Sequence, residues 1–282
     1  MMTNADSLVP MPVWWAIWFA FGACVGSFLN VCIHRMPRDQ SIVRPRSRCP
    51  HCRRMIVWYD NIPLLSFIVL AAHCRRCGKP IHWRYPLVEA LAGALTVAVL
   101  SRFGVTPVGL IYTAFALSLV AVSFIDLDFQ IIPDEISLGG LALGVIASCL
   151  VPSLHGAATV AQALGRSLLG AVVGGGVLYA TGVLGTLLFR KEAMGGGDIK
   201  LLAMAGAILG WKAVVLTFFL APLLALVPGI LVLLLKRSHV IPYGPFLSVA
   251  LLVALFAGPH IIALSGAEET IAMLWSYYRW GS

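Results

Sequence analysis

Eight apolar runs follow one another along this sequence, and they constrain its fold more than any other feature. They cover residues 12–33, 85–101, 107–125, 136–152, 166–189, 199–211, 213–235 and 244–264. Most of them approach the ~20 residues that an α-helix needs to cross the hydrocarbon core of a bilayer. The shortest, residues 199–211, covers only about 20 Å as a helix. We therefore expect it to be tilted, extended through the preceding Gly-rich segment, or partly re-entrant.

The composition excludes a soluble globular domain and a disordered chain. Hydrophobic residues make up 60% of the sequence, charged residues make up 11%, and the mean hydropathy is +0.91. A soluble domain carries about 25% charged residues, and disordered chains combine low hydrophobicity with high charge. The sequence therefore predicts an all-α polytopic membrane protein with about eight transmembrane helices and a small cytoplasmic loop domain.

Glycines spaced by four residues lie within three of the apolar runs. Small residues at this spacing let helices approach closely in lipid. The pairs are Gly140/Gly144, Gly170/Gly174 and Gly206/Gly210. We expect these glycines to serve helix packing.

The basic residues predict the orientation of the chain. The formal net charge is +8, and eleven of the 20 Lys and Arg residues lie between Arg35 and Arg84. Because loops rich in Lys and Arg stay in the cytoplasm, this loop is predicted inside. The first twelve residues hold no Lys or Arg, so the N-terminus is predicted outside, without a secretory signal. Alternation then places the basic pairs 190–191 and 236–237 inside too, and no nucleic-acid partner is needed to explain the charge.

Four of the seven cysteines form two Cys-x-x-Cys pairs within the basic loop. Cys49 and Cys52 are separated from Cys74 and Cys77 by 21 residues. This spacing is typical of a tetrahedral zinc site with four thiolate ligands. Two disulfides are the alternative, but thiols stay reduced in the cytoplasm. Four thiolates leave no open position for a substrate, so the predicted zinc is structural and folds the loop.

Acidic residues at predicted membrane boundaries form a second constellation. Asp126, Asp128 and Asp134 follow the third apolar run, and Asp198 opens the sixth. Two carboxylates held close together share a proton, because both cannot ionise. The ionised partner can take a proton from an attacking water while the protonated partner polarises a peptide carbonyl. The glycines at 195–197 are expected to adopt positive φ and to leave room for an extended substrate beside Asp198.

Several segments in a fixed order carry a resemblance to a known family. They are Gly26-Ser27-Phe28-Leu29-Asn30-Val31 with Arg35 and Pro37, the two Cys pairs, Arg84-Tyr85-Pro86-Leu87-Val88-Glu89, Ile125-Asp126 to Pro133-Asp134, Gly195-Gly196-Gly197-Asp198 and Pro242-Tyr243-Gly244-Pro245. Over nearly its whole length the chain resembles the type IV prepilin peptidases. These are bifunctional membrane aspartic proteases that share a Gly-x-Gly-Asp signature with presenilin-like enzymes.

The resemblance implies that Asp126 and Asp198 are the catalytic pair. Reasoning from the residues alone leaves Asp128 and Asp134 open as partners of Asp198. Asp126 lies nearest the end of the apolar run and would be the most desolvated. Asp134 precedes a new helix that it could cap, and Asp128 points to a different helix face from Asp126.

The resemblance also implies the reaction and its location. The substrates would be type IV prepilins or type II secretion pseudopilins, whose basic leader is removed at the cytoplasmic side of a bacterial inner membrane. The new N-terminal residue would then be methylated with S-adenosylmethionine, although the sequence holds no Rossmann-type loop that marks a cofactor site. The expected parts are an N-terminal tail and first helix (1–35), a zinc-binding loop (36–84) and a transmembrane protease core (85–282).

Three other kinds of protein share some of these sequence features. A non-enzymatic scaffold would use the zinc loop to bind a partner, and a transporter would place acids near the membrane midplane within inverted repeats. A zinc metalloprotease would need a motif such as His-Glu-x-x-His, which is absent from the sequence. Glu89, about one turn into the second run, could support the active site or pair structurally.

Overall fold

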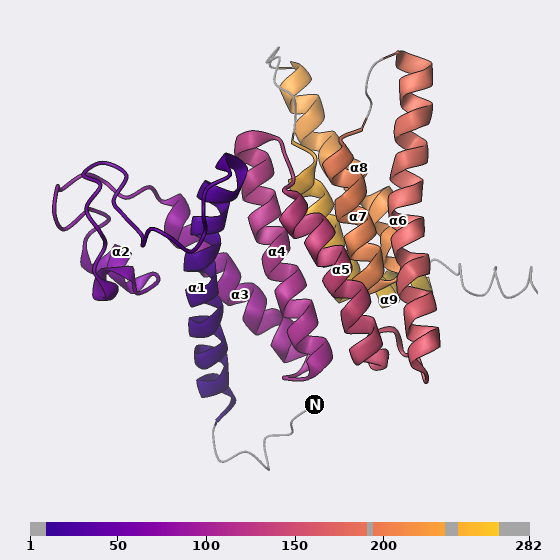
Figure 1. Ribbon diagram of the computed structural model, residues 1–282, viewed down its shortest axis with the longest axis horizontal. Coiled ribbons are helices and arrows are strands. Elements are labelled where there is room, and N and C mark those ends of the chain that lie inside the picture. The colour runs from indigo at the N-terminus through magenta and orange to yellow at the C-terminus, as the bar shows by residue number, and fades with distance from the viewer. Residues whose placement is uncertain (1–9, 191–193, 235–241, 265–282) are drawn as a thin grey trace, which may run out of the picture. The chain divides into compact units, whose positions relative to one another are not determined.

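The computed structural model describes residues 10–190, 194–234 and 242–264, and nearly all of the regular structure in them is helical. The long helices are α1 (Met11–Arg35), α3 (Arg84–Phe103), α4 (Pro107–Phe129), α5 (Asp134–Leu150), α6 (Val160–Phe189), α7 (Gly196–Leu209), α8 (Trp211–Leu234) and α9 (Gly244–Leu264) (Figure 1). The short elements are η1 (Met36–Arg38), η2 (Trp58–Asn61), α2 (Leu65–Val69) and η3 (Pro152–His155). Each of the eight predicted apolar runs lies largely within one long helix.

Six of these helices are long and apolar enough to cross a membrane within the described ranges. The candidate spans are Met11–Arg38, Arg84–Phe103, Pro107–Phe129, Val160–Phe189, Trp211–Leu231 and Gly244–Leu264. The predicted all-helical membrane architecture is therefore confirmed, but eight spans are not. The two remaining long helices, α5 and α7, have only 17 and 14 residues. The basic residues at 191, 236 and 237, like the first nine residues, lie outside the described part of the chain.

Local sequence signals explain where several helices begin and end. Thr106 caps α4, where its side chain accepts a hydrogen bond from the Gly109 N–H at 3.0 Å. Thr159 caps α6 in the same way through the Gln162 N–H, at 3.3 Å. At the other end of α7, Gly210 has a φ of 83°, a conformation that glycine adopts without strain. Gly210 therefore ends its helix. It also has the packing role that its spacing predicted, because a methyl group on Gly170 of α6 would lie 3.1 Å from its Cα.

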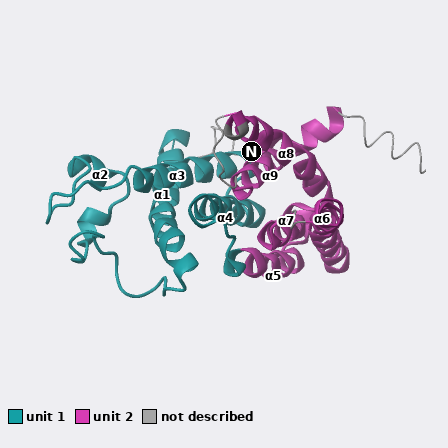
Figure 2. Cartoon of the chain, turned by 90° about the horizontal axis from the view of Figure 1, so that it is seen from above, with its two compact units in different colours: residues 1–136 teal, residues 137–282 magenta. Residues whose placement is uncertain are grey.

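The chain divides into two compact units, residues 1–136 and 137–282 (Figure 2). In the first unit, α1 packs against α3, and both contact α4. The core that they share consists of Leu29, Ile33, Val88, Ala92, Leu117, Val120, Ala121 and Ile125. A methyl group on Gly26 of α1 would lie 2.8 Å from the Cα of Glu89 on α3. Glycine therefore brings these two helices into direct contact.

The second unit is built around an even closer pair, α6 and α7. A methyl group on Gly170 would lie 2.0 Å from the carbonyl oxygen of Gly206, and one on Gly174 would lie 2.3 Å from that of Leu202. On α5, methyl groups at Gly140 and Gly144 would likewise meet side chains of α7. The packing role predicted for these five glycines is confirmed. Helices α8 and α9 pack against each other and complete the unit.

Candidate functional site

The four predicted zinc ligands lie together. One ligand atom from each of Cys49, Cys52, Cys74 and Cys77 is within 4.8 Å of all the others, and the Sγ atoms of Cys49 and Cys77 are 3.9 Å apart. Tetrahedral zinc with Zn–S bonds of about 2.3 Å needs sulfur atoms about 3.8 Å apart. All seven cysteines fall in the described part of the chain, and none forms a disulfide. The donor set therefore fits a metal ion with four thiolate ligands.

Two matching hairpin turns present the cysteines. In the first, the Cys49 N–H donates to the Arg54 carbonyl at 3.0 Å, and in the second the Cys74 N–H donates to that of Lys79 at 2.8 Å. The residue four places after the first cysteine of each pair has positive φ, 55° at Arg53 and 65° at Gly78. Hydrogen bonds from the backbone N–H groups of Cys77 and Arg76 lower the pKa of the Cys74 thiol to about 7. These backbone donors stabilise the thiolate, which is the form of cysteine that binds a metal.

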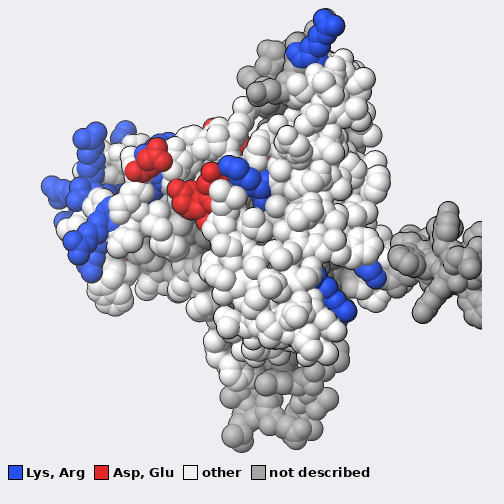
Figure 3. Space-filling model, turned by 45° about the vertical axis from the view of Figure 1, so that its right-hand side comes forward, with Lys and Arg blue, Asp and Glu red and all other residues white. Residues whose placement is uncertain are grey.

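The surface of the loop that holds this cluster is strongly basic. Figure 3 shows Lys and Arg side chains gathered on the loop, while most of the remaining visible surface is uncharged. Among the loop's acids, Asp60 is held by Arg75, with an N–O distance of 2.7 Å. The guanidinium of Arg75 also lies 5.5 Å from the ring centre of Tyr59. This ion pair fixes η2 against the second cysteine turn.

Asp126 is buried near the C-terminal end of α4. The residue is only 6% exposed. Its backbone carbonyl accepts the Gln130 N–H at 2.9 Å, a hydrogen bond at the C-terminal end of the helix. Asp134, by contrast, is exposed in the first turn of α5. A helix N-terminus favours a negative charge, which explains why an acid is tolerated there. The two acids thus occupy different environments.

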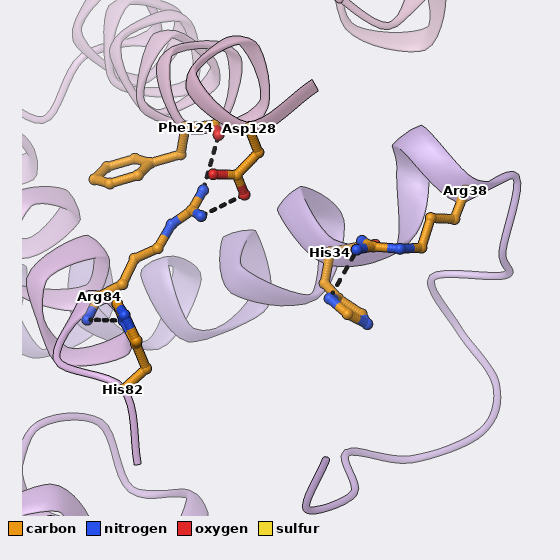
Figure 4. Close-up of polar contacts among 6 residues, drawn as sticks. All are labelled: His34, Arg38, His82, Arg84, Phe124 and Asp128. Carbon is orange, nitrogen blue, oxygen red and sulfur yellow. Dashed lines mark hydrogen bonds and ion pairs between the residues drawn. The ribbon is translucent and has the colours of Figure 1, made fainter. Parts of the chain in front are cut away.

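Asp128 is engaged by an arginine that sequence reasoning did not single out. Arg84, the first residue of α3, forms an ion pair with Asp128 and donates from Nη2 to the Phe124 carbonyl at 2.8 Å (Figure 4). Its guanidinium also lies 4.9 Å from the centre of the Phe124 ring. Arg84 therefore contacts the last turns of α4 at Phe124 and Asp128, the residues on either side of Asp126. The family motif that begins at Arg84 was the available signal for this role.

Asp198 lies half-buried in the first turn of α7. Gly195 precedes the helix with φ −69° and ψ 134°, and a methyl group on it would lie 3.0 Å from the Asp198 Oδ2. The glycine therefore leaves room for the carboxylate. The expected positive φ is wrong: residues 195–197 are all described, and none has it. The reason is that Gly196 and Gly197 already belong to the helix.

Tyr243 is the neighbour of Asp198 that the structure adds. It directly precedes α9 within the Pro242–Pro245 segment, and burial, followed by the charge of Asp198, raises the pKa of its phenol to about 12. The phenol therefore stays protonated at any working pH and can donate a hydrogen bond. Asp126 belongs to the first compact unit and Asp198 to the second, so their pairing stays a prediction.

A cavity of about 760 Å³ lies between the cysteine loop and the helices α1 and α3. Its lining includes both cysteine turns, Ser27 and Asn30 of α1, and Glu89 of α3. Glu89 is 9% exposed, and its Oε2 accepts the N–H of Leu64 at 2.9 Å. Glu89 therefore has a hydrogen-bond partner in the loop backbone, one of the two roles that the sequence left open for it. No short motif marks this cavity, because it forms between segments that are far apart in the sequence.

Two family models match adjoining parts of the chain. The bacterial peptidase A24 N-terminal domain matches residues 20–103, which include the four-cysteine cluster, and the type IV leader peptidase family matches residues 113–230, which include Asp126 and Asp198. No solved structure matches the chain.

Similar proteins are named prepilin leader peptidase/N-methyltransferase. The one from Myxococcus xanthus is 44% identical over 223 residues, which cover 79% of this chain and 64% of that protein. The one from Aeromonas hydrophila is 36% identical over 280 residues, which cover 88% and 92% of the two chains. The one from Stutzerimonas stutzeri is 38% identical over 291 residues, which cover 93% and 97%.

Proposed function

The chain belongs to the type IV leader peptidase family, and from this premise we propose that it is a prepilin leader peptidase/N-methyltransferase. It removes the basic leader from type IV prepilins or type II secretion pseudopilins and methylates the new N-terminal residue. The observation that carries the proposal is the match of the family to residues 113–230, which contain an acid buried at the end of α4 and an acid beside a glycine turn at the start of α7.

Asp126 and Asp198 are the proposed catalytic pair. The burial of Asp126 supports this choice, because a desolvated carboxyl group shares a proton more readily than a solvated one. Asp128 is committed to Arg84, and Asp134 is exposed. Neither is as well suited to proton sharing as Asp126.

The proposed cleavage needs only these two side chains and a water molecule. One carboxylate takes a proton from the water, whose oxygen attacks the carbonyl carbon of the scissile peptide bond. The partner carboxyl group gives its proton to the carbonyl oxygen. When the C–N bond breaks, its electron pair goes to the nitrogen, which takes a proton from the pair and leaves as the amine of the mature protein.

The four cysteines hold a structural zinc ion in this proposal, and residues 36–84 form a zinc-dependent region between the first helix and the protease core. The four-sulfur donor set supports zinc, which prefers tetrahedral thiolate sites. S-adenosylmethionine supplies an electrophilic methyl group for the second activity. The N-terminus faces the outside of the inner membrane, and the loop and aspartates face the cytoplasm, as the eleven basic residues between Arg35 and Arg84 favour. Helices α5 and α7 complete eight membrane-embedded helices.

Leader cleavage by the purified protein in lipid tests the pair. At matched folded amounts, Asp126→Asn and Asp198→Asn are expected to abolish cleavage of a prepilin. Asp134→Asn should stay within about twofold of the wild type, because an exposed acid costs little to replace. If Asp134→Asn abolishes cleavage and Asp126→Asn retains it, Asp134 is the partner of Asp198 instead of Asp126. Activity in all of these variants would overturn the aspartate mechanism.

A further inference from the structure

An apolar segment lies within the basic cysteine loop, and neither the proposed cleavage nor the cysteine cluster accounts for it. Residues 62–72 are Ile-Pro-Leu-Leu-Ser-Phe-Ile-Val-Leu-Ala-Ala and hold no charged side chain. The segment is too short to cross a bilayer, and apolar runs of this length are typical of interfacial or re-entrant segments. We propose that residues 62–72, with α2 at their centre, anchor the cysteine loop in the lipid beside α1. Such an anchor requires the membrane spans only and does not depend on the reaction that the chain catalyses.

The segment has an inner and an outer face. Ser66 and Phe67 line the cavity between the loop and the helices α1 and α3. Leu65, Ile68 and Val69 are instead 60%, 72% and 75% exposed. A group of exposed apolar side chains of this kind marks a surface that contacts a partner or a membrane. The outer face of α2 therefore needs a cover.

Contacts with two membrane helices fix the depth of this segment. The Leu64 N–H donates to the Glu89 Oε2 at 2.9 Å, and the Glu89 carboxylate also bonds the Ser27 side chain. Glu89 lies five residues after Arg84 and Ser27 eight residues before Arg35, which corresponds to about 8 Å and about 12 Å of helix.

The ends of α1 and α3 show what this depth means. Arg35 and Arg84 stand at those ends, and basic residues at the ends of membrane helices lie at the level of the headgroups. Figure 1 shows α2 level with the upper half of α1, not beyond its end. The segment therefore lies below the headgroups, close to the depth of about 5–10 Å at which interfacial helices bury their apolar face.

The surroundings of the segment match a lipid surface. Residues 36–84 hold ten Lys and Arg residues but only two acids, and Figure 3 shows basic side chains gathered on the loop. Basic clusters next to a membrane helix attract anionic headgroups. Trp58 precedes the segment and Trp83 follows it, 80% and 63% exposed, and Trp is typical of the membrane–water interface. A basic leader peptide or a second copy of the loop would be repelled by the same charges.

Lipid photocrosslinking of the full-length zinc-loaded protein tests the anchor. p-Benzoylphenylalanine takes the place of Val69 in one variant and of Val43 in another, in nanodiscs that contain phosphatidylglycerol. After irradiation, mass spectrometry of the loop peptides measures the share of each probe that carries a lipid. We expect about fivefold or more lipid adduct at position 69 than at position 43.

Val43 is the matched control because it is equally exposed but held elsewhere. It is 77% exposed. The Arg35 side chain donates to the Ser41 and Pro45 carbonyls at 2.9 Å and 2.8 Å, which holds this part of the loop at the end of α1. The two probes therefore differ in depth and not in exposure.

A charge on the outer face should withdraw the segment from the lipid. Ile68→Glu places a carboxylate where burial in lipid is costly, and we expect it to lower the adduct at position 69 about fivefold or more. Val43→Glu adds the same charge at the end of α1 and should leave that adduct unchanged. Zinc content and leader cleavage, measured on each variant, report whether the loop and the protease remain folded. If Ile68→Glu loses its zinc, a probe in place of Leu65 provides the second test and should also carry lipid.

Several outcomes would overturn the anchor. These are equal lipid adducts at positions 69 and 43, no lipid adduct at position 69, or an adduct at 69 that survives Ile68→Glu in a zinc-loaded protein. Crosslinks from position 69 to a second copy of the chain or to an added prepilin, in place of lipid, would show that the outer face binds protein. Failure of the wild type to cleave a prepilin would overturn the proposed function and leave the anchor in place.

Discussion

Glycines bring α1 against α3 in the first compact unit and α6 against α7 in the second, but they face different groups. In the second unit, methyl groups on Gly170 and Gly206 would each lie 2.0 Å from a backbone oxygen of the opposite helix. In the first unit, the nearest atoms to a methyl group on Gly22 or Gly93 belong to side chains, at 2.4 Å and 2.8 Å. Side chains can move, whereas a helix backbone cannot without moving the helix. Backbone atoms also lie close to such a methyl group in the first unit, at 2.7 Å for Gly22 and 2.8 Å for Gly26. The difference between the two pairs is therefore one of degree, and the α6–α7 contact that holds the helix with Asp198 is the closer and less adaptable.

Removal of the metal should have the largest effect, and it should affect only the first compact unit. Structural zinc contributes about 10 kcal/mol or more to the folding of small zinc domains. Cys49→Ser with Cys52→Ser should abolish stoichiometric zinc in elemental analysis and expose residues 36–83 to trypsin. Cleavage after Arg190, at the end of α6, serves as the internal control and should proceed at the wild-type rate. Unchanged digestion of the loop would contradict a structural metal.

Gly170→Ala should disrupt the close contact between α6 and α7. The added methyl group forces α6 and α7 apart, because the Gly206 carbonyl has no room to retreat, and a displacement near 1 Å at a catalytic group costs about 100-fold in rate. Leader cleavage by purified protein measures this loss. Gly176→Ala is the matched control in the same helix, since a methyl group there meets nothing within 4 Å. Equal activities of the two variants would show that the close backbone contact is dispensable.

Gly93→Ala should cost less, and a second substitution should relieve it. The added methyl group would lie 2.8 Å from two ring carbons of Phe19. Overpacking of this kind costs about 1–3 kcal/mol, which corresponds to a fall of about 2–6 °C in the unfolding midpoint. When Phe19→Ala is already present, adding Gly93→Ala should lower the unfolding midpoint much less than it does in the wild-type chain. If the stability losses of Gly93→Ala and Phe19→Ala simply add, the Phe19 ring is not the group that the added methyl contacts.

A proton-dependent contact at the end of α7 should give the smallest effect. His155 in η3 donates from Nε2 to the Ala207 carbonyl at 3.1 Å, and burial lowers the pKa of its ring below the ordinary value of 6.5. The stability that the neutral ring contributes is complete above pH 6.5 and is lost as the pH falls through the lowered pKa. Between pH 7.5 and 5, the unfolding midpoint should fall about 2 °C further in the wild type than in His155→Gln. Identical pH responses would contradict the assignment.

The features that the sequence predicted well are those that depend on residues close together in the chain. The apolar runs located all eight long helices, and the spacing of four cysteines predicted their cluster. The prediction of positive φ at residues 195–197 was wrong because α7 begins earlier than its apolar run. The Arg84 contacts and the Glu89–Leu64 hydrogen bond join residues 25 to 44 positions apart. Only packing decides which side chains meet over such separations.

The position of Arg84 determines how the two activities can be separated genetically. The cysteine loop joins α3 at this residue, and the Arg84 side chain contacts the end of α4 on either side of Asp126. Damage to the loop should therefore be transmitted within one turn of Asp126, the proposed catalytic acid. Cysteine variants should lose cleavage and methylation together, and such a joint loss would not mean that one centre performs both reactions. A clean separation of the two activities needs a change that leaves both the loop fold and the Arg84 contacts intact.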